Sequence, residues 1–188
     1  PIFFTQKPAS ELMPSLVGSE MCIRDSNNVT FYKYRETGGT IIIHMMKPEW
    51  IRKGVSDPVT MIASDGMPFA PGAHPRSAGT YSRVLGKYVR KERVMDLMTA
   101  LKKMTIMPAK RLEGTAPAMR NKGRIQVGAD ADITIFNPRT IIDRADFKGL
   151  KYSQGVEYVF VNGVLVVDKG ENVPNVYPGM PILGKYRK

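Results

Sequence analysis

The sequence predicts an α/β fold followed by a smaller all-β part. Two apolar, β-prone runs, 41–43 and 59–64, each lie between segments with helical spacing. Alternating strands and helices are typical of a parallel sheet covered by helices, and continuous apolarity indicates strands that are buried on both faces. After Lys122 the helical spacing stops, and short strands separated by turn residues follow.

The first part of the chain shows clear helix ends. Gly38-Gly39 ends a segment of helical spacing, because glycine accepts the left-handed conformation that follows many helices. Pro48 suits a first helical turn, and Asp96 is a good N-cap for the helix that follows it. The expected elements are a helix over 28–36, a strand over 40–46, a short helix over 48–53, a strand over 59–64, a loop over 67–79, and helices over 80–93, 97–104 and 108–112.

The second part consists of strands and turns. Asn162-Gly163 separates two β-branched runs, and this dipeptide is the strongest short signal for a hairpin. The boundary between the two parts is expected near residues 115–122. The expected elements are strands over 123–128 and 132–136, a hairpin over 158–167, and an irregular tail from residue 172.

Residues 15–26 resemble, over their whole length, the translation of a transposase-type sequencing adapter. Such a segment has no place in fold reasoning. We therefore interpret residues 1–26 as an unrelated leader with an adapter-like artefact, and we expect the natural protein to start near Asn27. The only cysteine, Cys22, lies inside this segment, so the cysteine content says nothing about the redox compartment.

The chain carries a formal net charge of +11 at pH 7, which raises the question of a nucleic-acid partner. The basic residues between Arg83 and Arg124 fall mostly at helical spacing, without an aromatic stacking platform, and this favours solvated helix faces. No apolar run approaches the roughly 20 residues of a membrane span, and no secretory signal is visible. We expect a cytoplasmic protein without nucleic-acid or membrane partners. The alternative is a basic, non-enzymatic β-rich binding module.

Four side chains and one glycine are candidates for a functional site. Asp65 follows an apolar run, where a carboxylate can act as a general base or can simply cap a turn with Gly66. Arg76 can hold a carboxylate in a two-bond fork or can pair with a nearby acid of the chain. His74 contacts substrate or orients the loop, and Gly66 permits a close backbone approach. His44 near the end of the first predicted strand is a further candidate.

These residues belong to a pattern that resembles the N-acyl-D-amino-acid deacylases (D-aminoacylases) of the amidohydrolase superfamily. The likeness covers roughly residues 30–170. The Ser-Asp-Gly and His-Pro-Arg elements are the narrow signature of the deacylase group, whereas the other elements are shared widely among amidohydrolases. The motifs that carry the likeness are Ile62-Ala63-Ser64-Asp65-Gly66, His74-Pro75-Arg76, Gly128-Ala129-Asp130-Ala131-Asp132 and Val161-Asn162-Gly163.

The resemblance implies a fold and a domain organisation. Residues 27–118 would be the C-terminal part of a metal-dependent (β/α)8 barrel and would contain its last two βα units. Residues 119–188 would be the C-terminal part of a small β-sandwich, followed by an irregular tail.

The resemblance also implies an activity, which is hydrolysis of the amide bond of N-acyl-D-amino acids. Asp65 would transfer the proton, and Arg76, with His74 and Gly66, would bind the substrate. Zn²⁺ would be the cofactor, with Asp65 and His44 as candidate ligands. The remaining ligands are absent from this sequence, so we expect the chain to be inactive alone. Another amidohydrolase, which opens cyclic amides or deaminates a ring, is the alternative enzyme.

Overall fold

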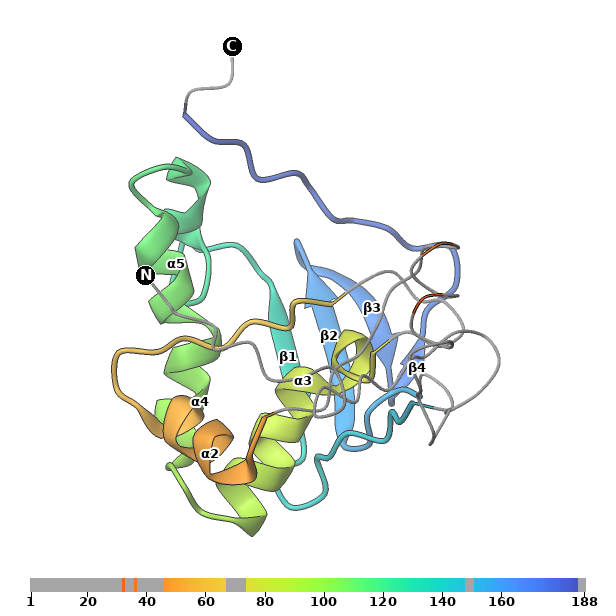
Figure 1. The fold of residues 1–188 in the computed structure, drawn as a ribbon. Helices are drawn as coiled ribbons and strands as arrows, with labels where there is room; N and C mark the ends of the chain where they lie inside the picture. Colours follow the sequence, from red (N-terminus) through yellow and green to blue (C-terminus); the bar gives the residue numbers. More distant parts are fainter. Residues whose placement is uncertain (1–31, 33–35, 37–45, 67–73, 148–150, 186–188) are drawn as a thin grey trace.

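The computed structural model describes residues 32, 36, 46–66, 74–147 and 151–185 of the chain. Helices gather on one side and a four-stranded sheet lies on the other (Figure 1). The helices are α2 (Pro48–Ser56), α3 (Arg76–Arg83), the π-helix η1 (Val84–Lys91), α4 (Leu97–Met104), α5 (Ile106–Leu112) and the 3-10 helix η2 (Pro117–Asn121). The strands are β1 (Ile133–Phe136), β2 (Val156–Val161), β3 (Val164–Asp168) and β4 (Glu171–Asn172).

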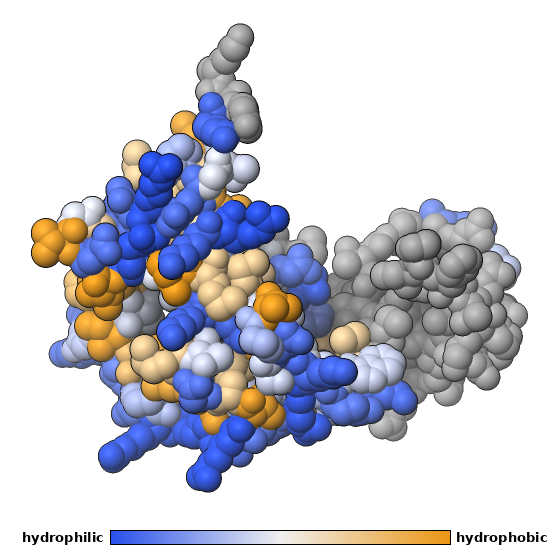
Figure 2. Space-filling model, turned by 90° about the vertical axis from the view of Figure 1, so that its left-hand side faces the viewer, coloured by the Kyte–Doolittle hydropathy of each residue, from blue (hydrophilic) through white to orange (hydrophobic). Residues whose placement is uncertain are grey.

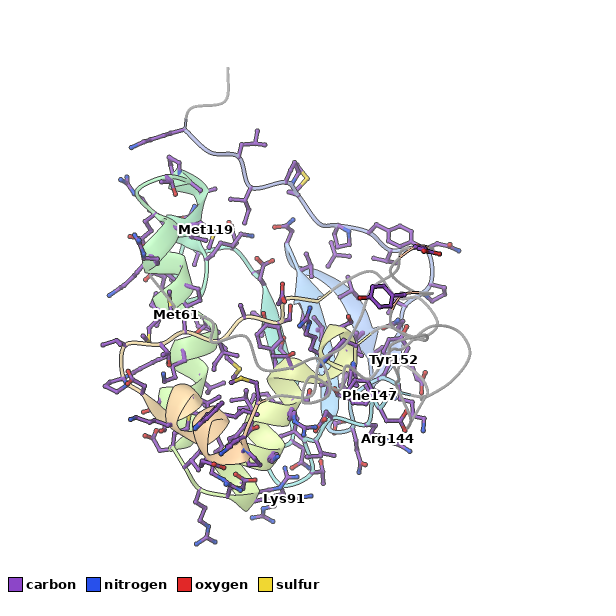
Figure 3. All side chains as sticks on the ribbon, viewed as in Figure 1. Met61, Lys91, Met119, Arg144, Phe147 and Tyr152 are labelled. Carbon is purple, nitrogen blue, oxygen red and sulfur yellow. The ribbon has the colours of Figure 1, made fainter. Side chains whose placement is uncertain are left out.

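The central element is one continuous helix, because α3 runs directly into η1. Lys91, labelled in Figure 3, marks its end. Its apolar face contains Val84, Leu85 and Tyr88, which are buried together with Ala100 of α4 and Ile141. The helix predicted over 80–93 is confirmed as far as Lys91, and it forms the core between the other helices and the sheet. Tyr81, which the same spacing places on the apolar face, is exposed.

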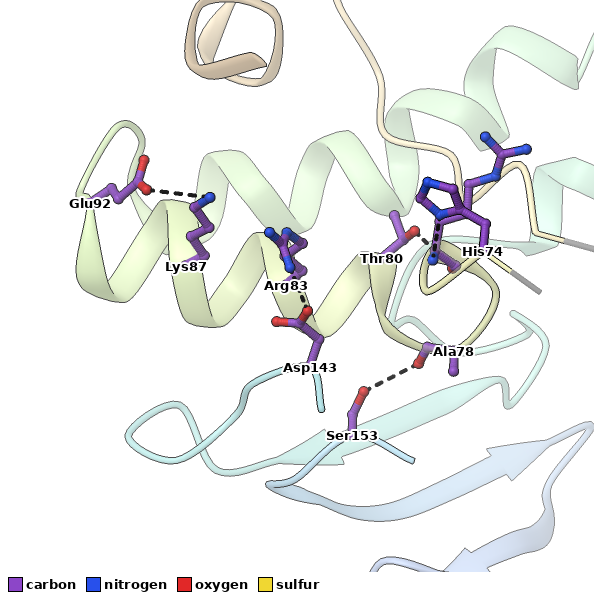
Figure 4. Close-up of polar contacts among 9 residues, drawn as sticks. His74, Ala78, Thr80, Arg83, Lys87, Glu92, Asp143 and Ser153 are labelled. Carbon is purple, nitrogen blue, oxygen red and sulfur yellow. Dashed lines mark hydrogen bonds and ion pairs between the residues drawn. The ribbon is translucent and has the colours of Figure 1, made fainter. Parts of the chain in front are cut away.

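The central helix approaches the segment 141–143 closely because it carries two glycines seven residues apart. A Cβ on Gly79 would lie 2.7 Å from the Cβ of Asp143, and one on Gly86 would lie 2.5 Å from the carbonyl oxygen of Ile141. An ion pair between Arg83 Nη1 and Asp143 Oδ2, 2.8 Å apart, closes the same contact (Figure 4). The central helix is therefore held against the connection between β1 and β2 by close backbone packing and by an ion pair.

The sheet is antiparallel in the order β1-β2-β3-β4. Asn162 and Gly163 both have positive φ, 48° and 75°, which is the conformation of a tight two-residue hairpin turn. Lys169 and Gly170 repeat this pattern between β3 and β4, with φ of 50° and 85°. The predicted hairpin is confirmed, as is the predicted strand over 132–136, which begins one residue later.

The prediction of a strand over 123–128 is wrong. Bends and turns occupy these residues, and no β-ladder includes them. Gly123 and Gly128 have φ of 69° and 83°, outside the extended region, and so they interrupt the run at both ends. Ile125 and Val127 are almost fully exposed as a result.

The prediction of a strand over 59–64 is also wrong in this structure. The segment, marked by Met61 in Figure 3, is extended but pairs with no strand among the described residues. Val59, Met61 and Ala63 are exposed, so the segment is not buried on both faces. The strand predicted beside it, 40–46, lies outside the described residues except for Met46. Residues 1–26 also lie outside them. Of the helix predicted over 28–36, only Tyr32 and Glu36 are described, and both are helical.

Two helices begin earlier than predicted. α3 begins at Arg76, inside the predicted loop over 67–79, because Pro75 already has helical dihedrals (φ −52°, ψ −24°). α5 begins at Ile106, two residues before the predicted start. α4 begins where expected, since the Asp96 carboxylate accepts a hydrogen bond of 2.8 Å from the backbone N–H of Thr99.

The helical side of the surface is mixed in character. Figure 2, which looks onto this side, shows apolar side chains scattered among hydrophilic ones. Lys102 and Lys110 are exposed on α4 and α5, while apolar side chains of the same helices pack inward, which fits solvated faces of amphipathic helices. In the described part of the chain, none of the helices is long and apolar enough to span a membrane.

Candidate active site

The site centres on the turn Ser64-Asp65-Gly66, which follows the extended segment. Ile62 donates its backbone N–H to the carbonyl of Lys103, 3.1 Å away, and this bond fixes the segment against α4. The backbone N–H of Gly66 donates to Ser64 Oγ at 3.3 Å. A Cβ on Gly66 would lie 3.2 Å from the Cα of Ser77, so the turn is packed against the first turn of α3. The close approach predicted for Gly66 is present, and its partner is the helix.

Asp65 has a positive φ of 46°, which is uncommon for a residue with a side chain but is tolerated by aspartate and asparagine. This conformation turns the carboxylate toward α3. Its Oδ2 lies 2.9 Å from Nη2 of Arg76, the first residue of that helix. The Asp65 side chain is 82% exposed, and that of Arg76 is 39% exposed. The structure therefore brings together the two residues that the sequence singles out most strongly, and it does so as an ion pair at the surface.

His74 supports the start of α3. Its Nδ1 accepts a hydrogen bond of 3.1 Å from the backbone N–H of Arg76 (Figure 4). An accepting Nδ1 carries no proton, so the neutral ring holds its proton on Nε2. The ring packs edge-on against Phe147, with the ring centroids 5.3 Å apart. Of the two roles that the sequence leaves open, these contacts favour orientation of the loop.

A buried lysine near the site escapes the sequence reasoning. Lys103 of α4 is 1% exposed, and its ammonium donates to the carbonyls of Asp57 and Thr60 and to Thr60 Oγ1. These acceptors lie directly before the segment that leads to Asp65. Burial lowers the pKa of Lys103, while the charge of Asp57 opposes this shift. The sequence contains no signal for this role, because Lys103 stands among basic residues at helical spacing.

The motifs shared widely among amidohydrolases form a second polar cluster, at the end of the sheet. The Lys122 ammonium lies 2.9 Å from Asp130 Oδ2 and also pairs with Asp132. Asp132 Oδ1 accepts the backbone N–H of Asn162 at 2.8 Å, which ties the Asp-Ala-Asp segment to the hairpin turn. Burial works to raise the pKa of Asp132, but these two partners outweigh it and the pKa is lowered. The cluster is a structural tie between β2 and the loop before β1.

The described residues do not make up a zinc site. A structural or catalytic Zn²⁺ takes three or four protein ligands, and within the described ranges no three His, Cys, Asp or Glu side chains come together to hold a metal. Asp65 offers one carboxylate. His44, the other predicted ligand, lies outside the described residues.

Comparison with known proteins decides the family. Residues 48–166, which include the Asp65 turn, α3 and the second polar cluster, match the Amidohydrolase family. The chain belongs to the amidohydrolase family.

Among relatives of this amidohydrolase, the N-acyl-D-aspartate deacylase of Alcaligenes xylosoxydans xylosoxydans is 36% identical over 139 residues, which are 73% of this chain and 27% of the relative. A crystal structure of a D-aminoacylase is similar at 34% identity with a TM-score of 0.65, over 72% of this chain and 28% of that one. The N-acyl-D-glutamate deacylase from Bordetella bronchiseptica, solved with zinc and a phosphonate inhibitor, matches at 36% identity with a TM-score of 0.61, over 70% and 28%. This chain thus spans slightly more than a quarter of each of these relatives.

Proposed function

We propose that this chain carries the proton-transfer aspartate and the carboxylate-binding arginine of a metal-dependent N-acyl-D-amino-acid deacylase. The observation that carries the proposal is the 2.9 Å contact between Asp65 and Arg76. In an N-acyl amino acid, a single carbon separates the amide nitrogen from the carboxylate. A group that binds this carboxylate and a group that hands a proton to this nitrogen must therefore be neighbours.

Each residue has a defined task in this proposal. Hydrolysis of an amide needs a polarised carbonyl, an activated water and a proton for the leaving amine. Asp65 takes the proton of the water and delivers it to the nitrogen. Arg76 forms a fork with the carboxylate and so orients the substrate. His74 holds the first residue of α3, and Gly66 lets the turn pack against this helix. The described residues assign no group to carbonyl polarisation, which a bound metal ion would supply.

The finer architecture is part of the same proposal. We infer that residues 27–118 form the C-terminal part of the amidohydrolase barrel and that residues 119–188 form the β-sandwich part and tail. In support, the elements over 48–121 are helices, whereas the strands among the described residues all follow residue 132. The chain by itself is proposed to be inactive. Stoichiometric zinc binding together with acid release from an N-acetyl-D-amino acid by the purified chain would contradict this.

A chimera tests the activity. The matching segment of the N-acyl-D-aspartate deacylase is replaced by residues 48–166 of this chain. We expect the zinc-loaded chimera to hydrolyse N-acyl-D-aspartate and not the L-isomer. Asp65→Asn in the chimera should lower kcat by about 10²- to 10⁴-fold, the usual share of general acid–base catalysis. Asp143→Asn is the matched control and should keep kcat. It breaks the ion pair between Asp143 and Arg83, and Arg83 lies on α3, the helix that also carries Arg76. A soluble, zinc-loaded chimera without hydrolysis contradicts the proposal.

Further assays test two alternative functions. Ring-opening or deaminating activity of the same chimera would favour a different amidohydrolase, although the deacylase matches speak for acyclic amides. The net charge of +11 motivates a nucleic-acid test of the purified chain by filter binding. Affinity that falls steeply with added salt would favour the binding module.

A further inference from the structure

The roles proposed for Asp65 and Arg76 conflict in the observed geometry. Arg76 Nη2 forms an ion pair with Asp65 Oδ2 at 2.9 Å, so the Asp65 carboxylate occupies the guanidinium that is to receive the substrate carboxylate. The same contact engages an oxygen of Asp65 that is to receive a proton. Both groups become available only when the pair separates.

The guanidinium is incompletely satisfied by this partner. Among buried side-chain nitrogens and oxygens of the described residues, Arg76 Nε is the one without a hydrogen-bond partner. A buried donor without a partner is unfavourable. A planar carboxylate that meets the Nε–Nη2 edge accepts two parallel hydrogen bonds, whereas the ion pair with Asp65 is formed at Nη2. A ligand carboxylate that meets this edge once Asp65 has left Nη2 gives Nε the partner that Asp65 does not supply.

The turn keeps Asp65 near the ligand after it is displaced. Gly66 is packed 3.2 Å from Ser77 at the position of a Cβ, and its N–H is bonded to Ser64 Oγ. These contacts hold the backbone at Gly66 against α3, so in the proposed release the Asp65 side chain rotates away from Nη2 while the turn stays in place. The Asp65 side chain is 82% exposed, so water solvates its carboxylate when it leaves Arg76.

We propose that the substrate carboxylate exchanges with Asp65 on Arg76, so that binding of an N-acyl amino acid with a free carboxylate itself releases Asp65 for proton transfer. The exchange replaces one carboxylate by another at a single cation and leaves the charge of the pair unchanged. It makes the free carboxylate a condition of activity and not only of affinity. An N-acyl amino acid amide, which lacks the carboxylate, leaves Asp65 held. This inference rests on the proposed function for the identity of the substrate.

The exchange predicts that Asp65 weakens ligand binding. Exposed ion pairs are worth about 0.2–1 kcal/mol, which corresponds to a change in affinity of about 1.5- to 5-fold. Removing the charge of Asp65 should therefore tighten the binding of a carboxylate ligand by about this factor. A residue that merely contacts substrate would give the opposite result when it is replaced.

The test is a binding titration of the complete 188-residue chain with N-acetyl-D-alanine, with its primary amide as the carboxylate-free control. Chemical shifts of the arginine Nε–H groups report binding, and low ionic strength keeps the contribution of exposed charges measurable. Asp65→Asn suits the positive φ of the turn, and Asp65→Ser is the second variant if asparagine disturbs the turn. Arg76→Gln removes the site. Asp143→Asn breaks the pair with Arg83 and is the matched control.

We expect Asp65→Asn to bind N-acetyl-D-alanine about 1.5- to 5-fold more tightly than the wild type, Asp143→Asn to bind as the wild type does, and Arg76→Gln and the amide ligand to show no binding. Unchanged or weaker binding by both Asp65 variants overturns the exchange, and so does an absence of binding by wild type and variants alike. The assay measures no hydrolysis, so an inactive chimera combined with tighter binding by Asp65→Asn would refute the proposed function and leave the exchange standing.

Discussion

Replacement of Lys103 by methionine tests whether the buried lysine holds the segment that leads to Asp65. The change keeps the length and the burial of the side chain but removes the donor shared by Asp57 and Thr60. The Asp57 carbonyl keeps the backbone N–H and the hydroxyl of Thr60 as donors, whereas the Thr60 carbonyl loses the ammonium, and an acceptor left without a partner costs about 1–3 kcal/mol. Methionine avoids the desolvation of an ammonium, which offsets part of this loss. The expected net decrease in the free energy of unfolding is therefore about 1–2 kcal/mol.

The assay is urea unfolding followed by circular dichroism, with Lys102→Met as control. Lys102 is the exposed neighbour on the same helix, and its replacement should change the free energy of unfolding by less than about 0.5 kcal/mol. A double-mutant cycle with Thr60→Val isolates the contact between the two side chains, and a coupling above about 0.5 kcal/mol is expected. Lys103→Met with the stability of the control refutes the reasoning.

The pH dependence of the same two proteins gives an independent readout. Burial lowers the folded-state pKa of Lys103, while the charge of Asp57 opposes this, and the unfolded chain keeps the ordinary value of 10.5. Between the lowered value and 10.5 the unfolded chain holds more protons than the folded chain, so this group makes stability rise with pH. The difference in stability between wild type and Lys103→Met should therefore shift in favour of the wild type as pH approaches 10.5. Parallel curves would show that the amine is not desolvated.

Three further substitutions test the packing and the second polar cluster. Gly86→Ala should lower the free energy of unfolding by about 1–3 kcal/mol, since its Cβ would lie 2.5 Å from a backbone oxygen. Gly54→Ala in α2, where nothing lies within 4 Å of the added Cβ, should raise it by about 0.5–1 kcal/mol in the same urea unfolding assay. Burial works to raise the pKa of Asp132, but the Lys122 ammonium and the backbone N–H of Asn162 hold this pKa below its usual 3.8. The ionised carboxylate therefore stabilises the fold above pH 3.8, and this contribution is lost as the pH falls through the lowered pKa. Asp132→Asn should therefore flatten the acid limb of the stability curve below about pH 4; an unchanged limb would contradict this.

The features that the sequence predicts correctly depend on few neighbouring residues. Asp96 caps α4 through a residue three positions away, and Asn162-Gly163 turns the chain because both residues accept positive φ. The apolar face of the central helix follows from its own spacing. Such signals act within a turn or two of chain, and no tertiary information is needed to recognise them.

The errors concern features that depend on distant partners. The segment 59–64 has the composition of a strand, but a strand needs a neighbour to accept its hydrogen bonds, and here the backbone of Ile62 bonds to α4 instead. In 123–128 the flanking glycines override the β-branched residues. The candidate site shows the same contrast between features set by local sequence and features set by distant contacts. Asp65 and Arg76 are recognisable as chemical groups, whereas their mutual contact depends on the packing of Gly66 against Ser77.

The exposure of the Asp65–Arg76 pair has a consequence for how the site works. An ion pair in a dry interior would be costly to break, about 3–5 kcal/mol for the loss of one partner, and would lock the arginine to its own chain. At 82% and 39% exposure the pair is weak enough for a substrate carboxylate to displace it. Proton transfer by Asp65 would gain from the opposite condition, because electrostatic and hydrogen-bonding interactions strengthen when water is excluded. The two demands are compatible only if the proposed carboxylate exchange comes first and water is excluded afterwards.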